Sequence, residues 1–239
     1  MTHSTALQKS GPRLRRSTSA LNHLHVIPRI LVPEQLDALA PEDPAALHSR
    51  RDLRLINFAL GNSFWWRRTF ARVGPAATSP SRRGLELGAG DGILARRHGL
   101  HALDPVPPPA DWPAGQDWHQ SDVRNYAGWA EHDLIAANLF LHHLDDEALR
   151  DLGRKINPHA RVVLACEPLR RAGRPRLLEF FCTVIGANPV TRHDGAVSIR
   201  AGFIGNELPD LLGLHAPLWR VKITESHRGA YRMVALRTS

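Results

Sequence analysis

The sequence predicts an α/β protein with a doubly wound, mostly parallel sheet of seven strands that ends in an antiparallel hairpin. Two observations predict this class. From residue 83 onward, short apolar runs typical of buried strands alternate with glycine loops and helical patterns. Near the C-terminus, the run 218–225 instead alternates apolar and polar residues. A turn at Arg228 and Gly229 then leads into a similar run at 230–236, which is the pattern of a hairpin at a sheet edge.

The part of the chain before this pattern divides into two segments. Residues 1–33 contain five basic residues and no acidic one. We expect 1–26 to be a disordered basic leader; a transit peptide or codons upstream of the true start would have a similar composition. Residues 27–80 are expected to form a helical cap, because apolar residues recur at three- and four-residue spacing in 51–70 and Gly61 can end a helix. Residues 81–239 are then the main domain.

The strands and helices of the main domain are predicted from its apolar runs and from the capping and proline residues between them. Strands are expected at 84–87, 100–103, 117–120, 133–141, 161–168, 218–225 and 230–236, and helices at 92–99, 144–156 and 174–186. Asp145 is the expected N-cap of the second helix. The proline run after Asp104 cannot be helical, so we expect the helix between the second and third strands to be reduced or replaced by a loop. The segment 188–214 is expected to be irregular except for a short helix at its end.

The composition limits the class of protein. Apolar residues make up 43% of the 239 residues and charged residues 23%, which is ordinary for a globular protein. No apolar run approaches the ~20 residues that a membrane span needs. Two cysteines cannot build a disulfide framework, so we expect a cytoplasmic protein. The net charge of +8 leaves a nucleic-acid partner open.

A glycine loop follows the first strand. Gly88, Gly90 and Gly92 alternate, whereas the dinucleotide-binding pattern needs its third glycine at position 93, which is Ile. Glu86 and Asp91 would also repel a pyrophosphate. A ligand with an ammonium and a sulfonium group and no phosphate suits these two carboxylates. S-adenosylmethionine has that chemistry.

The segment LELGAGDG resembles motif I of the class I S-adenosylmethionine-dependent methyltransferases, and later segments match that family in order and spacing. The resemblance covers residues 83–186 and implies the Rossmann-like methyltransferase fold. It implies that Asp104 binds the ribose hydroxyls, that Asp122 meets the adenine and that Asn138 lies near the methionine moiety. The cofactor-binding residues expected in this way are Glu86, Leu87, Gly88, Ala89, Gly90, Asp104, Asp122, Val123 and Asn138.

Methyl transfer to a hydroxyl also needs a group that takes the acceptor proton, and histidine suits this role. His142 and His143 follow the fourth strand, where a doubly wound sheet opens its crevice. His193 precedes Asp194, which could orient its ring. These three histidines are the catalytic candidates. The candidates for acceptor binding are Arg192, Arg200 and Trp65, and no metal site is expected.

The region 188–212 is similar to the substrate side of bacterial methyltransferases that act on phenolic, polyketide or quinone-like molecules. We therefore expect methylation of a small molecule at a phenolic or polyketide-like hydroxyl. The fourth strand lacks the Asn-Pro-Pro-Tyr motif of nucleobase methylation. An RNA methyltransferase, with rRNA or tRNA as substrate, stays an alternative because of the basic leader. A non-catalytic binding protein on the same fold is another, and a nicotinamide-dependent oxidoreductase is a distant one.

Overall fold

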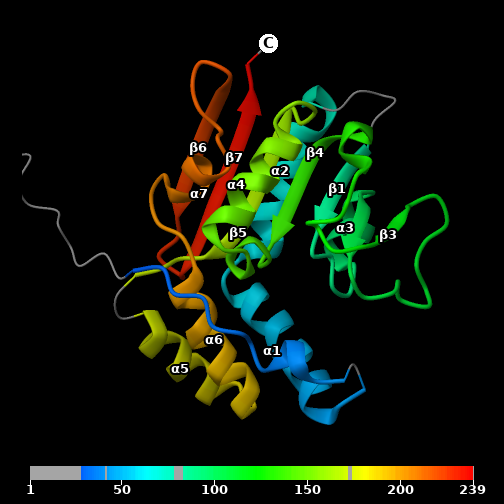
Figure 1. The fold of residues 1–239 in the computed structure, drawn as a ribbon. Helices are drawn as coiled ribbons and strands as arrows, with labels where there is room; N and C mark the ends of the chain where they lie inside the picture. The colour runs from blue at the N-terminus through cyan, green and yellow to red at the C-terminus, as the bar shows by residue number, and fades with distance from the viewer. Residues whose placement is uncertain (1–27, 41, 78–82, 172–173, 239) are drawn as a thin grey trace, which may run out of the picture.

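A computed structural model describes residues 28–40, 42–77, 83–171 and 174–238 (Figure 1). The expected leader at 1–26 lies outside the described residues. At the centre is a seven-stranded sheet in the order β3-β2-β1-β4-β5-β7-β6. Its strands are β1 (Arg83–Leu87), β2 (His101–Asp104), β3 (Trp118–Gln120), β4 (His132–Asn138), β5 (Val162–Pro168), β6 (Trp219–Glu225) and β7 (Ala230–Arg237).

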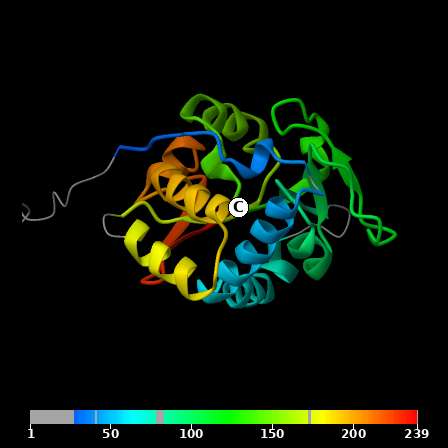
Figure 2. The ribbon, with the colours of Figure 1, turned by 90° about the horizontal axis from the view of Figure 1, so that it is seen from below.

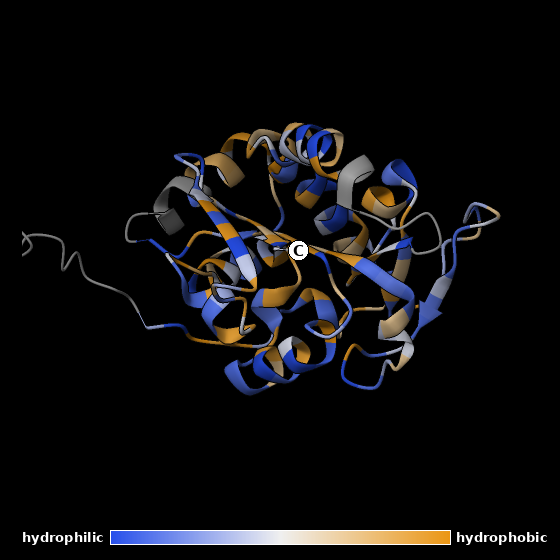
Figure 3. Cartoon of the chain, turned by 90° about the horizontal axis from the view of Figure 1, so that it is seen from above, coloured by the Kyte–Doolittle hydropathy of each residue, from blue (hydrophilic) through white to orange (hydrophobic). Residues whose placement is uncertain are grey.

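The strand directions confirm the predicted fold class. Strands β1 to β5 run parallel, and β7 runs antiparallel to both β5 and β6. The near-continuous apolar runs of β4 and β5 are buried on both faces of the sheet, as expected for central parallel strands. Viewed from above, apolar residues concentrate on these central strands (Figure 3).

Helices cover both faces. The helical segments are η1 (Leu36–Ala38), α1 (Pro44–Ala59), α2 (Asn62–Ala77), α3 (Ile93–His98), η2 (Gly128–Glu131), η3 (Leu141–His143), α4 (Asp146–Ile156), α5 (Arg174–Val184), α6 (Pro189–Ala201) and α7 (Glu207–Leu211). On one face α4 and α7 bury Leu149 and Leu208, and on the other α2 and α3 bury Trp66 and Ala95. The segment between β2 and β3 contains no helix, as the proline run predicts.

The two helices of the N-terminal segment, α1 and α2, pack in different parts of the protein. Helix α1 begins with its N-cap Asp43, whose side chain accepts a hydrogen bond from the Ala45 amide. The chain then turns at Gly61, where φ is +72°, so the predicted helix end is confirmed. Helix α1 packs against α6, which packs against α5, and together they cover the lower end of the sheet (Figures 1 and 2). Helix α2 instead joins the core of the sheet, through Trp66 and Val73.

The prediction for 188–214 was wrong in its first half. Residues 189–201 form the 13-residue helix α6, and only the short helix α7 later in the segment was expected. Asn188 caps α6 by accepting a hydrogen bond from the Thr191 amide at 2.8 Å. The helix contains a glycine and several β-branched residues, whose intrinsic helix propensity is low. Packing against α1 and α5 stabilises it, which sequence periodicity does not reveal.

Across the described ranges, we find no helix with the length and apolar character needed to cross a membrane.

Candidate functional site

A cavity of about 1190 Å³ lies at the carboxyl ends of β1 and β4. Residues of α1, α6 and the N-terminal segment 28–40 also line it. We call residues 28–40 the strap. Pockets for one small ligand measure roughly 300–1,000 Å³. The cavity therefore has room for a cofactor and a second molecule. A doubly wound sheet is expected to bind ligands at this edge.

The glycine loop forms one wall of the cavity. Gly88 and Gly90 both have positive φ, +62° and +56°. A side chain on Gly88 would place its Cβ 2.1 Å from the ring of Phe140, whereas Gly90 faces open space. The Asp104 carboxylate accepts hydrogen bonds from the Gly90 and Val106 amides at 2.8 and 2.9 Å. The loop is thereby tied to the end of β2 with its bare backbone toward the cavity.

Glu86 is a buried carboxylate in the cavity wall. Its Oε2 accepts a hydrogen bond from the Ala95 amide at 2.7 Å, and no cation of the described residues pairs with it. Burial raises the pKa of Glu86 well above its ordinary value, and the carboxylates of Asp91 and Asp104 add to this rise. The lining includes Arg54, whose guanidinium lies 3.7 Å from the Asp91 carboxylate, so Glu86 is the carboxylate of this wall that is left without a described cationic partner. The wall fits a cationic ligand group and does not fit a diphosphate.

Asn138 ends β4 and lines the same cavity. The indole Nε1 of the buried Trp66 donates a hydrogen bond to its Oδ1 at 2.9 Å. The next residue, Leu139, has a φ of +55°, a conformation that costs energy for a residue with a branched side chain. Strained backbone of this kind clusters at functional sites, and here it also lines the cavity.

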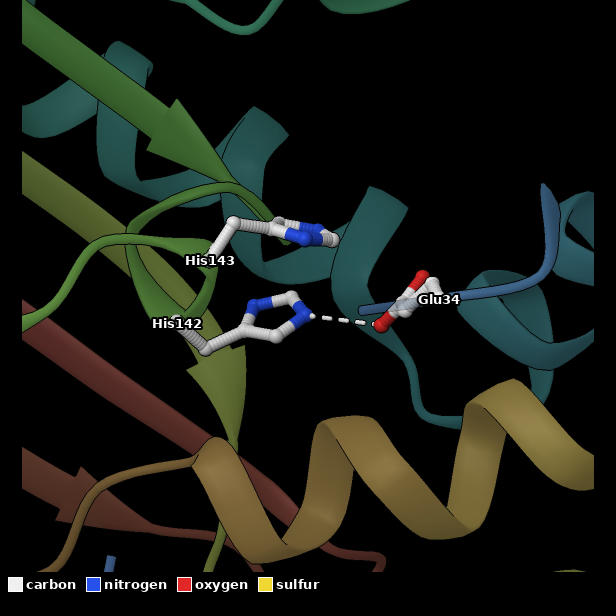
Figure 4. A group of neighbouring side chains, drawn as sticks. All are labelled: Glu34, His142 and His143. Carbon is white, nitrogen blue, oxygen red and sulfur yellow. Dashed lines mark ion pairs between the residues drawn. The ribbon is translucent and has the colours of Figure 1, made fainter. Parts of the chain in front are cut away.

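His142 is buried between the carboxylates of Glu167 and Glu34, and Figure 4 shows Glu34 facing its ring. Its Nδ1 lies 2.7 Å from Oε2 of Glu167, and its Nε2 lies 3.6 Å from Oε1 of Glu34. Burial alone would lower the pKa of His142, but the two carboxylates more than offset this and raise it to about 9. The Glu167 carboxylate also accepts hydrogen bonds from the Phe140 and Leu141 amides, which fixes the η3 turn.

His143 stacks on His142 with ring centroids 4.2 Å apart (Figure 4). Burial lowers the pKa of His143, and the neighbouring His142 lowers it further. Its Nδ1 lies 3.9 Å from Oδ2 of Asp37 on the strap. Both histidines line the cavity, so the structure brings two of the three predicted catalytic candidates to the site. Their catalytic role stays a prediction.

Some of the other predicted site residues line the cavity, and others do not. Glu86, Gly88, Ala89, Gly90 and Asn138 line the cavity. Among the described residues, the lining does not include Leu87, Asp104, Asp122, Val123, His193, Arg192, Arg200 or Trp65.

Local contacts account for several of those outside the lining. Asp122 accepts a hydrogen bond from the Arg124 amide at 2.8 Å and closes a turn after β3. Nδ1 of His193 lies 2.9 Å from Oδ1 of Asp194, as predicted, but on α6 and with a half-exposed ring. Arg192 donates to the Ala187 carbonyl and the Thr183 hydroxyl. The roles of these residues stay predictions.

Sequence reasoning missed three groups that the structure places at the site. These are Glu34 and Asp37 on the strap, and Glu167 at the end of β5. The strap carries no motif, and its acids reach the cavity only through tertiary packing. A signal did exist for Glu167, because it is a charged residue at the end of an otherwise apolar run.

Comparisons with known proteins agree with this geometry. Solved structures with a similar fold include the plantazolicin methyltransferase BpumL, determined with S-adenosylhomocysteine and a triazolic substrate analogue. It has a TM-score of 0.59 and 12% identity, covering 82% of this chain and 92% of that one. The related methyltransferase BamL has a TM-score of 0.60 and 9% identity, covering 85% and 93%. This chain has the class I methyltransferase fold.

A third structure with this fold is the Burkholderia thailandensis 1,6-didemethyltoxoflavin-N1-methyltransferase, which contains its substrate and S-adenosylhomocysteine. It has a TM-score of 0.50 and 18% identity, covering 88% of this chain and 94% of that one. A scan of protein-family models gave no match, and a search of curated proteins gave none. At these identities the methyltransferase fold is established through structure, and the chemistry has to be argued from the site.

Proposed function

We propose that this protein is an S-adenosylmethionine-dependent methyltransferase that methylates a small molecule at a phenolic or polyketide-like hydroxyl. The observation that carries the proposal is the buried Glu86 carboxylate. It lies without a described cationic partner in the wall of a large cavity, beside the bare amides of the glycine loop. A buried charge is costly unless it is paired, so this wall is built for a ligand that brings a positive group.

Residues of the methyltransferase fold would hold the cofactor at this wall. Gly88, Ala89 and Gly90 offer close approach to backbone, Glu86 offers negative charge, and Asn138 offers an amide that Trp66 holds in place. Asp104 acts here by fixing the loop, because both of its oxygens accept backbone hydrogen bonds. We propose that its contact with the ribose, like that of Asp122 with the adenine, is added to these bonds.

The reaction needs little covalent chemistry from the protein. When bound, S-adenosylmethionine supplies a methyl group on a cationic sulfur; an acceptor oxygen bonds to the methyl carbon while the carbon–sulfur bond breaks and leaves its electron pair on sulfur. The protein has to position the acceptor, exclude water and take up the acceptor proton. His142 and His143 are the predicted candidates that line the cavity, and we propose that they act on the acceptor oxygen.

The lining favours a planar apolar acceptor. Phe58, Phe180 and Phe181 line the cavity, and the first two are 76% and 68% exposed. Exposed aromatic rings at a cavity mouth offer flat apolar contact area that a small aromatic molecule would cover. Proteins with the same fold methylate plantazolicin and didemethyltoxoflavin, which supports a small-molecule acceptor here.

Transfer of labelled methyl groups tests the proposal. The full chain would be incubated with methyl-labelled S-adenosylmethionine and a panel of phenols, aromatic amines, carbon acceptors and RNA. We expect label on phenolic hydroxyls. Label on RNA alone would support the nucleic-acid alternative. Cofactor binding with no transfer to any acceptor would support the non-catalytic alternative.

A further inference from the structure

We propose that Glu34, His142 and His143 bind one divalent transition-metal ion at the acceptor end of the cavity. The site would take Zn²⁺ or a similar ion that prefers imidazole and carboxylate ligands. Metal binding itself does not depend on the proposed methyl transfer, although the use of the ion in catalysis does. The sequence predicted no metal site, because Glu34 is distant from the histidines along the chain.

The first support is the spacing of the three donor groups. Each offers one ligand atom, and these atoms all lie within 4.8 Å of one another (Figure 4). Two ligands bound to one zinc ion at about 2.1 Å in tetrahedral geometry lie roughly 3.4 Å apart. The 3.6 Å between Nε2 of His142 and Oε1 of Glu34 is close to that value. It is too long for a good hydrogen bond.

The second support is the orientation of His142. Its Nδ1 lies 2.7 Å from a carboxylate oxygen of Glu167, which is itself buried and held by backbone amides of the η3 turn. Metal-binding histidines usually donate one ring N–H to such a carboxylate and present the other nitrogen to the ion. Here the other nitrogen, Nε2, faces Glu34.

The third support is that hydrogen bonds of the strap hold Glu34 in position. The strap is fastened on both sides of this residue: Arg29 donates to the Ala201 carbonyl at 2.9 Å, and Asp194 accepts from the Gln35 and Leu36 amides at 2.8 and 2.9 Å. The hydroxyl of Ser198 donates to the Glu34 carboxylate. A ligand held in this way loses little conformational freedom on binding an ion.

Local charge also favours a dication. The carboxylates of Glu34, Asp37 and Glu167 surround the two imidazoles. Three protein ligands leave coordination positions open, as in catalytic metal sites. When bound, the ion would supply Lewis-acid chemistry that lowers the pKa of an acceptor hydroxyl, so His142 and His143 would act on the acceptor oxygen by holding the ion.

Metal titration of the full chain tests this site. After treatment with a chelator, the protein would be titrated with Zn²⁺ by calorimetry and with Co²⁺ by visible absorption, whose intensity reports the coordination number. We expect one equivalent of each ion to bind. Glu34→Gln and His143→Gln should each weaken binding at least tenfold. His215→Gln is the matched control, because His215 also pairs with an aspartate, Asp210, but lies outside the described cavity lining and does not contact the strap.

The outcomes separate the two proposals. Absence of stoichiometric binding to wild-type protein would overturn the metal site, as would equal binding by wild type, Glu34→Gln and His143→Gln. Binding of S-adenosylhomocysteine would be measured on the same samples. It should survive in all variants that fold, so loss of metal with retained cofactor binding supports the metal site. A protein that binds metal but no S-adenosylhomocysteine would instead contradict the proposed methyltransferase.

Discussion

The indole of Trp66 donates a 2.9 Å hydrogen bond to the amide oxygen of Asn138, which joins α2 to the end of β4 at the cavity. Trp66→Phe keeps most of the ring and removes the donor. A fully buried acceptor left unsatisfied costs about 1–3 kcal/mol, and because Asn138 is only half-buried the loss should lie at the low end of this range. We expect unfolding by denaturant to show a loss of this size, together with weaker binding of S-adenosylhomocysteine. Trp65→Phe is the control, and equal effects of the two substitutions would contradict the role assigned to the hydrogen bond.

Replacing Glu86 tests the electrostatics of the cavity wall. Burial raises the pKa of Glu86, so the folded protein binds more protons than the unfolded chain above the ordinary pKa of a glutamate. Ionised Glu86 therefore destabilises the ligand-free fold as the pH rises. We expect Glu86→Gln to be more stable relative to wild type at pH 8 than at pH 5, and to bind the cofactor more weakly. Stability and affinity falling together would contradict this account.

The buried His132, at the start of β4, predicts that the fold loses stability in acid. His132 is buried beside Tyr126, whose hydroxyl lies 2.7 Å from its Nε2. Burial, together with smaller contributions from His101 and His119, lowers the pKa of His132 to about 4. The unfolded chain binds the extra proton first, so the stability from neutral His132 is complete above pH 6.5 and is lost as the pH falls toward 4. In urea titrations from pH 7.5 to 4.5, His132→Gln should flatten this loss; an unchanged slope would contradict the prediction.

At Gly153 in α4 we expect alanine to be less favourable than glycine, the reverse of the usual preference inside a helix. Alanine is normally favoured over glycine inside a helix by about 1 kcal/mol. A Cβ at this position would lie 2.4 Å from the Leu212 carbonyl oxygen, so α7 could not stay where it packs. We expect Gly153→Ala to destabilise the protein by about 1–3 kcal/mol, as overpacking does. A melting temperature equal to or above that of wild type would show that α4 and α7 pack less closely than described.

Removing residues 1–26 tests the RNA alternative. These residues hold four of the basic residues of the chain. If the acceptor is a small molecule, methyl transfer should be nearly unchanged. A nucleic-acid substrate would instead lose affinity on truncation, and that affinity would fall steeply with added salt in the untruncated protein.

The sequence allowed the sheet to be predicted and only part of the site. Strands such as β4 and β5 are continuous apolar runs, and the motif of the glycine loop consists of a few consecutive residues, so both can be recognised without knowing the fold. Helix α6 was missed because its stability comes from packing against α1 and α5, and this placed His193 on a helix instead of a loop. Glu34 was missed for a related reason. Its neighbours in space are not its neighbours in the chain.

Calorimetric titration with S-adenosylhomocysteine tests the central claim most directly. Two leucine substitutions would be compared with wild type, Gly90→Leu in the cavity wall and Gly205→Leu on the surface. Both glycines have positive φ, +56° and +48°, and open space around the added side chain, so the backbone strain is matched. The account predicts one bound molecule per wild-type chain, retained binding by Gly205→Leu and loss of binding by Gly90→Leu. Absence of binding to wild type, or equal binding by all three proteins, would contradict it.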